Sequence, residues 1–348
     1  VTELADWGAD GGGTDTNADA DSDTDLPDVI EMDCSACNAV GTEVADLLCA
    51  LDLCDPEYVL AGGAAEDYKQ VTDYRTDGEN VTCERGDPRE AITRFSLDGS
   101  DNDLGSKLNG SYAILTTGDW DQPIHSTSCS PWVVTDVDSG DYEFDENSMT
   151  YDQVYDAVEW RLSLRAPPDA RSFSFDYVFF SVEYVEFIGG DFNDKFYATL
   201  EADSTNGGAA TVINFTRCRD EDEYYDFVCP EADALEQSCD PGFKYCYIAI
   251  NSAVSDCCWH NGCPGSEEDP PTSIAGTGYG CGTQEDDGVS HGSSTGWLHT
   301  AWPIDGGEEF TLTFHIHDTG DSTRDSAVIL DRFQFHRSFV NGGTVVIE

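Results

Sequence analysis

The sequence predicts an all-β protein: an antiparallel β-sandwich or jelly roll with a short N-terminal helix and a disulfide-rich insertion. Three observations support this fold class. After residue 54 the chain mostly alternates apolar and polar residues with a period of two, as half-buried strands do. Gly, Asp, Asn and Ser interrupt this alternation at short intervals, which is typical of turns between antiparallel strands. No internal repeat of about 20–50 residues is visible, which argues against a solenoid or a propeller.

The individual elements follow from the same patterns. Val44, Leu47, Leu48 and Leu51 recur at helical spacing, so we expect one short helix within residues 34–54, pinned by cysteines at each end. Alternating or β-branched segments bounded by turn residues are expected to be strands. These segments are 111–117, 158–164, 173–179, 196–200, 211–215, 245–250, 310–316 and 327–335.

The chain holds 14 cysteines and only 2 methionines, which favours an oxidising exterior and up to about seven disulfides. Eight of the cysteines lie within residues 218–281, so we interpret 218–300 as a disulfide-bound insertion. Zinc is the alternative, for example at Cys257, Cys258, His260 and Cys263. Adjacent cysteines are poorly placed to share one tetrahedral ion, however, and we therefore prefer disulfides.

The charge balance is extreme, with 16 Lys and Arg against 70 Asp and Glu and a formal net charge of −54. This argues against binding to nucleic acid or to an anionic membrane surface, since both require cationic patches. No run of about 18 apolar residues exists that would span a bilayer. Counter-ions must offset the self-repulsion, and carboxylate clusters bind hard cations such as calcium. We therefore expect a cation-loaded, secreted protein at the cell surface.

Composition divides the chain into three parts. Residues 1–33 are an acidic arm without Lys or Arg, residues 34–337 form the sandwich, and residues 338–348 are a C-terminal strand tail. The tail combines the turn signal Asn341-Gly342 with the β-branched run Thr344–Ile347. Such a strand pairs within its own sheet, the commoner arrangement, or with the edge of another molecule. The first residue, Val1 rather than Met, leads us to expect a removed signal peptide.

Two segments place several oxygen donors beside a predicted strand end. One runs from Ser181 to Phe196 and the other from Asp318 to Asp331. Calcium takes about six to eight oxygen ligands, which loops rich in Asp, Asn and backbone carbonyls supply. Gly320 would permit a tight turn. The alternative is that these are ordinary acidic turns, in which Asp and Asn bond to their own backbone.

These segments also carry a resemblance to a known family. The blocks SFDYVFFSVEYVEFIGGDFNDKFYATL and TGWLHTAWPIDGGEEFTLTFHIHDTGDSTRDSAVILDRFQF resemble two characteristic blocks of the choice-of-anchor L domain. LCDPEYVLAG and GSKLNGSYAILTTGD are similar to its opening segments, so the resemblance covers residues 50–337. That family comprises bacterial surface proteins, and the acidic arm is similar to stalks of myxobacterial secreted proteins. The resemblance implies a secreted β-sandwich-like domain and supplies no catalytic set.

The acidic loops and the resemblance together lead us to expect bound calcium. The expected ligands are Glu183, Asp191, Asn193, Asp194, Asp318, Asp321 and Asp325. The cysteine-rich insertion and the tail after Phe335 depart from the family pattern and leave the role of this chain open.

Signals for other chemistry are weaker. Gly292–Gly296 has the letters of a Gly-x-Ser-x-Gly elbow but lacks the flanking strand and helix. Glu183 and Glu186 would form a glycosidase pair only if their carboxyls faced each other. His315 and His317 share one face of a predicted strand and could bind a transition metal, although ordinary sheet residues show the same pattern more often.

Aromatic residues and sequons add two further possibilities. Sugar rings stack on tryptophans, but tryptophans in a β-protein usually belong to the core. The candidates are Trp120, Trp132, Trp259, Trp297 and Trp302. The sequons at Asn80, Asn109 and Asn214 are informative only if the source glycosylates them.

We therefore expect a non-enzymatic structural or adhesive protein that forms an extracellular filament. Copies would join head to tail by exchange of the terminal strand, stabilised by disulfides and calcium. A secreted carbohydrate-binding module, with an extracellular polysaccharide as partner, is the main alternative. A secreted hydrolase is the second alternative.

Overall fold

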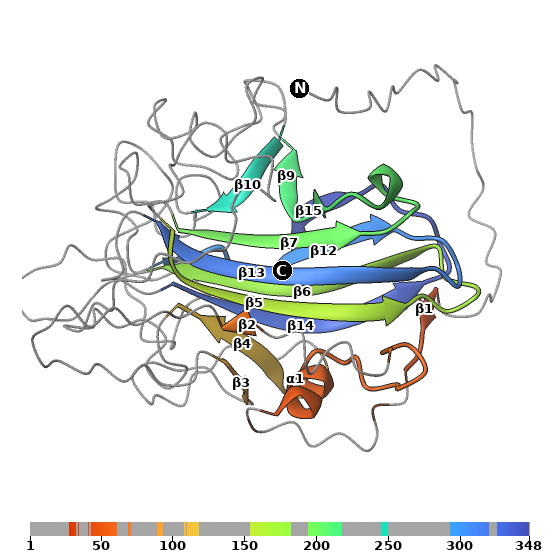
Figure 1. The fold of residues 1–348 in the computed structure, drawn as a ribbon, viewed down its shortest axis with the longest axis horizontal. Coiled ribbons are helices and arrows are strands. Elements are labelled where there is room, and N and C mark those ends of the chain that lie inside the picture. The colour runs from red at the N-terminus through yellow and green to blue at the C-terminus, as the bar shows by residue number, and fades with distance from the viewer. Residues whose placement is uncertain are drawn as a thin grey trace, which may run out of the picture.

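The computed structural model describes residues 28–32, 34, 41, 43–60, 69–70, 89–92, 108, 110–117, 154–181, 194–217, 245–249, 293–319 and 326–347. These residues form two facing antiparallel sheets and one short helix, which confirms the predicted all-β class (Figure 1). Among them, no helix is long and apolar enough to cross a membrane.

The first sheet has eight strands. Its order is β15 (Gly343–Val346), β12 (Leu298–Pro303), β6 (Ser172–Ser181), β14 (Ser326–His336), β4 (Tyr112–Thr116) and β3 (Arg89–Ile92). In addition, β1 (Val29–Ile30) pairs with β14, and β11 (Ser293–Ser294) pairs with β6. The C-terminal strand thus pairs within its own chain and forms one edge of this sheet.

The second sheet has seven strands. Its order is β2 (Lys69–Gln70), β5 (Val154–Arg165), β13 (Glu309–Thr319), β7 (Lys195–Glu201), β10 (Tyr245–Ala249) and β9 (Phe215–Arg217), and β8 (Thr211–Val212) pairs with β7. The long strands β5, β13 and β7 lie side by side in Figure 1.

The core lies between the two sheets and consists of alternate residues of the facing strands. Phe173 of β6 stacks on Phe310 of β13 with ring centroids 5.4 Å apart, and Phe175 meets Phe314 edge-on at 5.1 Å. All four rings are buried. The two-residue period that predicts these strands therefore also identifies their core faces.

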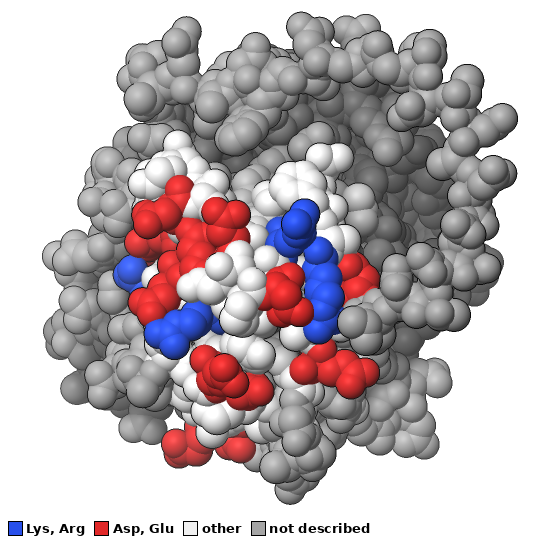
Figure 2. All heavy atoms as spheres, turned by 90° about the vertical axis from the view of Figure 1, so that its right-hand side faces the viewer, with Lys and Arg blue, Asp and Glu red and all other residues white. Residues whose placement is uncertain are grey.

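Two short connections, 166–171 and 304–308, cross between the sheets at one end of the sandwich, and 202–210 joins β7 to β8 at the same end. We call this the turn end. β5 stops before Pro167-Pro168, because proline cannot continue a central strand. A Cβ on Gly306 would lie 2.2 Å from the carbonyl oxygen of Pro168, so only glycine fits this close crossing. Figure 2 shows basic and acidic side chains interspersed at this end. Arg161 and Glu201 form an ion pair at 3.2 Å.

The predicted helix is α1 (Val44–Ala50), and it lies beside β3 and β4. Leu47 and Ala50 are buried, and Leu51 just beyond the helix is buried as well. A disulfide joins Cys34 to Cys54, so the helix is pinned across its length. Cys49 is also disulfide-bonded. The alternative zinc ligands Cys257, Cys258, His260 and Cys263 lie outside the described residues.

The same helix is tied to the first sheet by an irregularity in β14. The register of β14 against β6 shifts between Asp331 and Gln334, and Arg332 adopts a φ of +50°. The amide of Phe333 then donates to the carbonyl of Leu51 at 3.0 Å. The β-bulge thus turns a backbone donor out of the sheet and toward the end of α1.

The structure differs from the sequence prediction at 211–215, where one strand was expected. The segment is divided into β8 and β9, with Ile213 and Asn214 between them. The Oδ1 atom of Asn214 accepts from the amide of Ala198 at 2.7 Å, and its Nδ2 donates to the carbonyl of Phe196 at 2.9 Å. This buried side chain replaces a strand in pairing with β7, and its burial excludes glycosylation of this sequon in the folded protein.

Replacing Asn214 is expected to destabilise the fold. Asn214→Ala should lower the free energy of unfolding by about 2–3 kcal/mol, because a buried amide and a buried carbonyl of β7 lose their partners. Urea denaturation measures this difference. The exposed Asn341 offers a matched control, and Asn341→Ala should change stability by less than about 0.5 kcal/mol. Equal effects of the two variants would contradict the role assigned to Asn214.

Candidate functional site

The two sequence blocks that predict calcium meet at the end of the sandwich opposite the turn end. We call this the motif end; it is formed by Ser181, Asp194, Asp318 and Ser326. Asp194 immediately precedes β7, and Asp318 lies near the end of β13. His317 pairs in register with Lys195, so Asp318 and Asp194 are each one residue farther along two neighbouring strands. Both carboxylates are buried, with residue exposures of 1% and 0%.

Ser326 connects this end to the other sheet. Its Oγ donates to Asp194 Oδ2 at 2.5 Å, which links the first residue of β14 to the residue before β7. Its amide donates to Thr117 Oγ1 at 2.8 Å, and its carbonyl accepts from the Thr117 amide at 2.9 Å. Ser326 also pairs in register with Ser181. The starts of β7 and β14 and the ends of β4 and β6 are thereby fixed relative to one another.

The structure therefore brings together two of the seven predicted calcium ligands, Asp194 and Asp318. The others are Glu183, Asp191, Asn193, Asp321 and Asp325, and they lie outside the described residues. Their segments, 182–193 and 320–325, leave from and return to the motif end along the chain. Within the described ranges, no group of three or more His, Cys, Asp or Glu side chains is arranged to hold a metal ion.

A row of titratable side chains crosses the outer face of the second sheet next to the motif end. The register places Glu159 of β5, His315 of β13 and Tyr197 of β7 side by side. Glu159 Oε2 lies 4.0 Å from His315 Nδ1, and the Tyr197 ring packs 6.4 Å from the His315 ring. His315 and Tyr197 are each 1% exposed, although they point away from the core between the sheets.

His317 lies two residues beyond His315 on the same face of β13, next to this row. Its Nδ1 lies 2.9 Å from His315 Nε2, and its ring packs 5.9 Å from that of Tyr197. Burial lowers the pKa of His315 to about 3. Burial lowers the pKa of His317 well below its usual value too, and the charges of His315 and Lys195 lower it further. Both imidazoles are therefore neutral at pH 7.

Sequence reasoning identified the shared face of His315 and His317 but missed Glu159, Lys195 and Tyr197. Glu159 lies on β5, and Lys195 and Tyr197 lie on β7, all more than 100 positions before the histidines, so only the strand register brings them together. The signal in the sequence is indirect: a polar side chain occupies the outward position of an alternating strand in each case.

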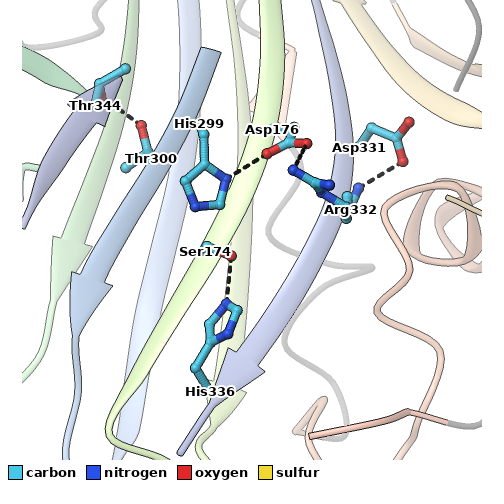
Figure 3. A network of polar contacts seen from close by, with 8 residues as sticks. All are labelled: Ser174, Asp176, His299, Thr300, Asp331, Arg332, His336 and Thr344. Carbon is cyan, nitrogen blue, oxygen red and sulfur yellow. Dashed lines mark hydrogen bonds and ion pairs between the residues drawn. The ribbon is translucent and has the colours of Figure 1, made fainter. Parts of the chain in front are cut away.

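A second polar network lies on the outer face of the first sheet (Figure 3). Asp176 of β6 is fully buried, and its two carboxylate oxygens face different partners. Oδ1 lies 2.7 Å from His299 Nδ1, and Oδ2 lies 2.5 Å from Arg332 Nη2. Asp331 Oδ1 accepts from the amide of Arg332 at 2.7 Å, which holds the arginine at the bulge. This network joins β12, β6 and β14.

The same face carries a contact to the N-terminal segment. His336 Nε2 lies 2.7 Å from Ser174 Oγ, and His336 Nδ1 lies 3.6 Å from Asp28 Oδ2. Burial lowers the pKa of His336, and Asp28 opposes that shift. Ser174, near the start of β6, is 1% exposed, so the serine does not present a nucleophile to solvent. The arrangement ties β1 to the sheet.

The other sequence candidates are placed as follows. Ser294, the central serine of the Gly292–Gly296 motif, is buried in β11 and is followed by β12 rather than by a helix, so no nucleophile elbow forms. Trp297 is buried, and Trp302 packs against the core and donates from Nε1 to Thr205 Oγ1 at 3.0 Å. Trp297 therefore offers no open ring to a sugar, whereas Trp302 is half-buried. The remaining candidates, Glu183, Glu186, Trp120, Trp132 and Trp259, lie outside the described residues.

Comparison of the chain with models of known families, with curated proteins and with solved structures found no match. The conclusions on function therefore depend on the geometry described above and on the motif resemblance.

Proposed function

We propose that this protein is a secreted structural or adhesive surface protein whose copies assemble into a filament by exchange of the C-terminal strand. The observation that carries this proposal is the position of β15, which forms one edge of the first sheet. Disulfide bonding at Cys34, Cys49 and Cys54 supports an oxidising, extracellular location.

The contacts of β15 suit transfer between copies. Its ladder with β12 covers four residue pairs, Thr344 Oγ1 lies 2.7 Å from Thr300 Oγ1, and the amide of Ile347 donates to the Trp297 carbonyl at 3.0 Å. A neighbouring copy's strand can make every one of these contacts, because it has the same sequence. Each subunit would then give one strand and receive one, which propagates head to tail without closing.

The charge distribution also favours this segment as the junction. Residues 338–347 carry no charge in a chain of formal charge −54, so two copies can meet there with little direct repulsion. Phe339 and Val345 are the exposed large apolar side chains of the described residues, at 67% and 55%. Association of copies through this strip would remove both from water.

We further propose that calcium stabilises the motif end. Asp194 and Asp318 start from neighbouring positions on β7 and β13, and the acidic segments 182–193 and 320–325 adjoin them in sequence. Oxygen donors gathered from two loops are what calcium requires. The ion would neutralise carboxylates that otherwise repel each other within a subunit and between subunits.

Assembly of copies, exchange of β15 and stabilisation by calcium can be tested separately. In millimolar calcium, light scattering and electron microscopy should detect particles much larger than 37.9 kDa, and a calcium chelator should shorten or dissolve them. An excess of a peptide with the sequence of residues 338–348 should cap growing particles, whereas a scrambled peptide should not. A particle that stays monomeric at high protein concentration would contradict assembly. Particles insensitive to the chelator would contradict only the calcium proposal.

A further inference from the structure

The sequence of β15 by itself specifies its register poorly. Residues 342–346 read Gly-Gly-Thr-Val-Val, so neighbouring registers would offer similar backbone and apolar contacts. Gly-rich strands are prone to slip along their partner for this reason. In the structure β15 pairs with β12 in one register, in which Thr344 lies opposite Thr300. Two contacts of β15 with its surroundings select this register.

The first contact is between Gly342 and the ring of Trp302. A Cβ at position 342 would overlap with carbon atoms of that ring, so only glycine fits there. Residues of the second sheet and its connections hold the ring in place. Trp302 Nε1 donates to Thr205 Oγ1 at 3.0 Å, and the Phe215 ring packs edge-on against the indole at 5.9 Å. The position opposite Trp302 is therefore closed to any larger residue.

The second contact is a small polar cluster in an otherwise apolar core. Thr344 Oγ1 lies 2.7 Å from Thr300 Oγ1, and both threonines are buried. The hydroxyl of Tyr177 adjoins this pair: burial raises the pKa of Tyr177, and the side chains of Thr344, Thr300 and Asn214 oppose that rise. A buried hydroxyl without a partner is costly. Position 344 therefore requires a residue that brings a hydroxyl to Thr300.

Together the two contacts exclude the other registers. A shift that brings Gly343 against Trp302 would place Val345 opposite Thr300, and valine offers no hydroxyl. Every other shift within residues 338–348 would place a residue with a Cβ against the ring. We infer that β12 accepts β15 in this register only and selects a strand with glycine and, two residues later, threonine or serine.

For a strand from a second copy, this inference rests on the proposed strand exchange and names what the accepting copy recognises. For the subunit's own strand, it holds without exchange. The partner that fits is an extended segment with the pattern Gly-x-Thr, which residues 342–344 of another copy provide. The exposed side chain of Val345 points away from the accepting surface and takes no part in the selection.

Peptides with the sequence of residues 338–348 test the selection on assemblies of the full chain. Thr344→Val keeps the shape of the side chain but removes its hydroxyl, so the concentration needed to cap growth should rise about tenfold. Gly342→Ala should raise it by about 10- to 100-fold, because the added methyl group meets the Trp302 ring. Thr344→Ser keeps the hydroxyl and should cap within about threefold of the unmodified peptide. Val345→Thr, at an exposed position, is the matched control and should cap as the unmodified peptide does.

The outcomes separate this inference from strand exchange. Equal capping by all five peptides would overturn the selection and leave strand exchange intact. No capping by the unmodified peptide would contradict strand exchange, and the register is then tested in the subunit itself. In the full chain, Thr344→Val should speed amide hydrogen exchange in β12 and β15 by about tenfold, whereas Val345→Thr should leave it unchanged. Equal rates in these two variants would overturn the inference for the subunit's own strand as well.

Discussion

Lowering the pH from 7 to 4 in a metal chelator is expected to reduce the free energy of unfolding by about 3 kcal/mol through His315 alone. Burial lowers the pKa of His315 to about 3 in the folded protein, against about 6.5 in the unfolded chain. Between these two values only the unfolded chain takes up the proton. Stability is therefore complete above about pH 6.5 and is lost as the pH falls toward 3. Burial of His317 acts in the same direction.

Urea denaturation at a series of pH values measures this effect, but the carboxylates of the chain titrate in the same range. His315→Gln provides the reference, because the acids act on both proteins alike. The stability advantage of the unmodified protein over this variant should shrink by about 3 kcal/mol between pH 7 and pH 4. A constant difference across the series would show that His315 does not titrate as its burial requires.

Asp176→Ala is expected to lower the free energy of unfolding by about 3 kcal/mol. The carboxylate is fully buried, forms an ion pair with Arg332 and lies at hydrogen-bond distance from His299, so its removal leaves both side chains without their anion. The side chains of Arg332 and His299 are 30% and 25% exposed, and water compensates part of the loss. Because Asp176 joins β12 and β14 across β6, amide exchange in β12 should also become faster.

The turn end offers a matched control for this prediction. Asp169 pairs with Arg337 at 2.8 Å, but the two side chains are 55% and 36% exposed. Asp169→Ala should therefore cost less than about 1 kcal/mol, as exposed ion pairs do. Similar losses in the two variants would mean that burial does not set the strength of the Asp176 network.

Most of the sandwich could be predicted from the sequence, because its long strands have one face in the core. The alternation at 158–164, 173–179 and 310–316 identified β5, β6 and β13, although each strand extends beyond the predicted range. Asn214 interrupted the expected strand at 211–215 because its side chain satisfies backbone groups of β7, a long-range contact that no local pattern encodes. β12 was missed, since it begins inside the range interpreted as the insertion.

The candidate site was predictable only in part, for a related reason. Motif resemblance pointed to Asp194 and Asp318, and strand pairing brings them to one end of the sheet. The chain from Glu159 to His317 could not be found in this way, because cross-strand neighbours depend on register. A shift of one residue between β5 and β13 would move Glu159 to the opposite face from His315.

The disulfide between Cys34 and Cys54 has a mechanical consequence. In a protein pulled from its two ends, β1 should peel away first, because its ladder with β14 spans only two residues. Tension would then reach Cys34 and pass through the covalent bridge directly to Cys54. The helix between them would lie outside the path of the force, so α1 should stay folded while tension passes from Cys34 to Cys54.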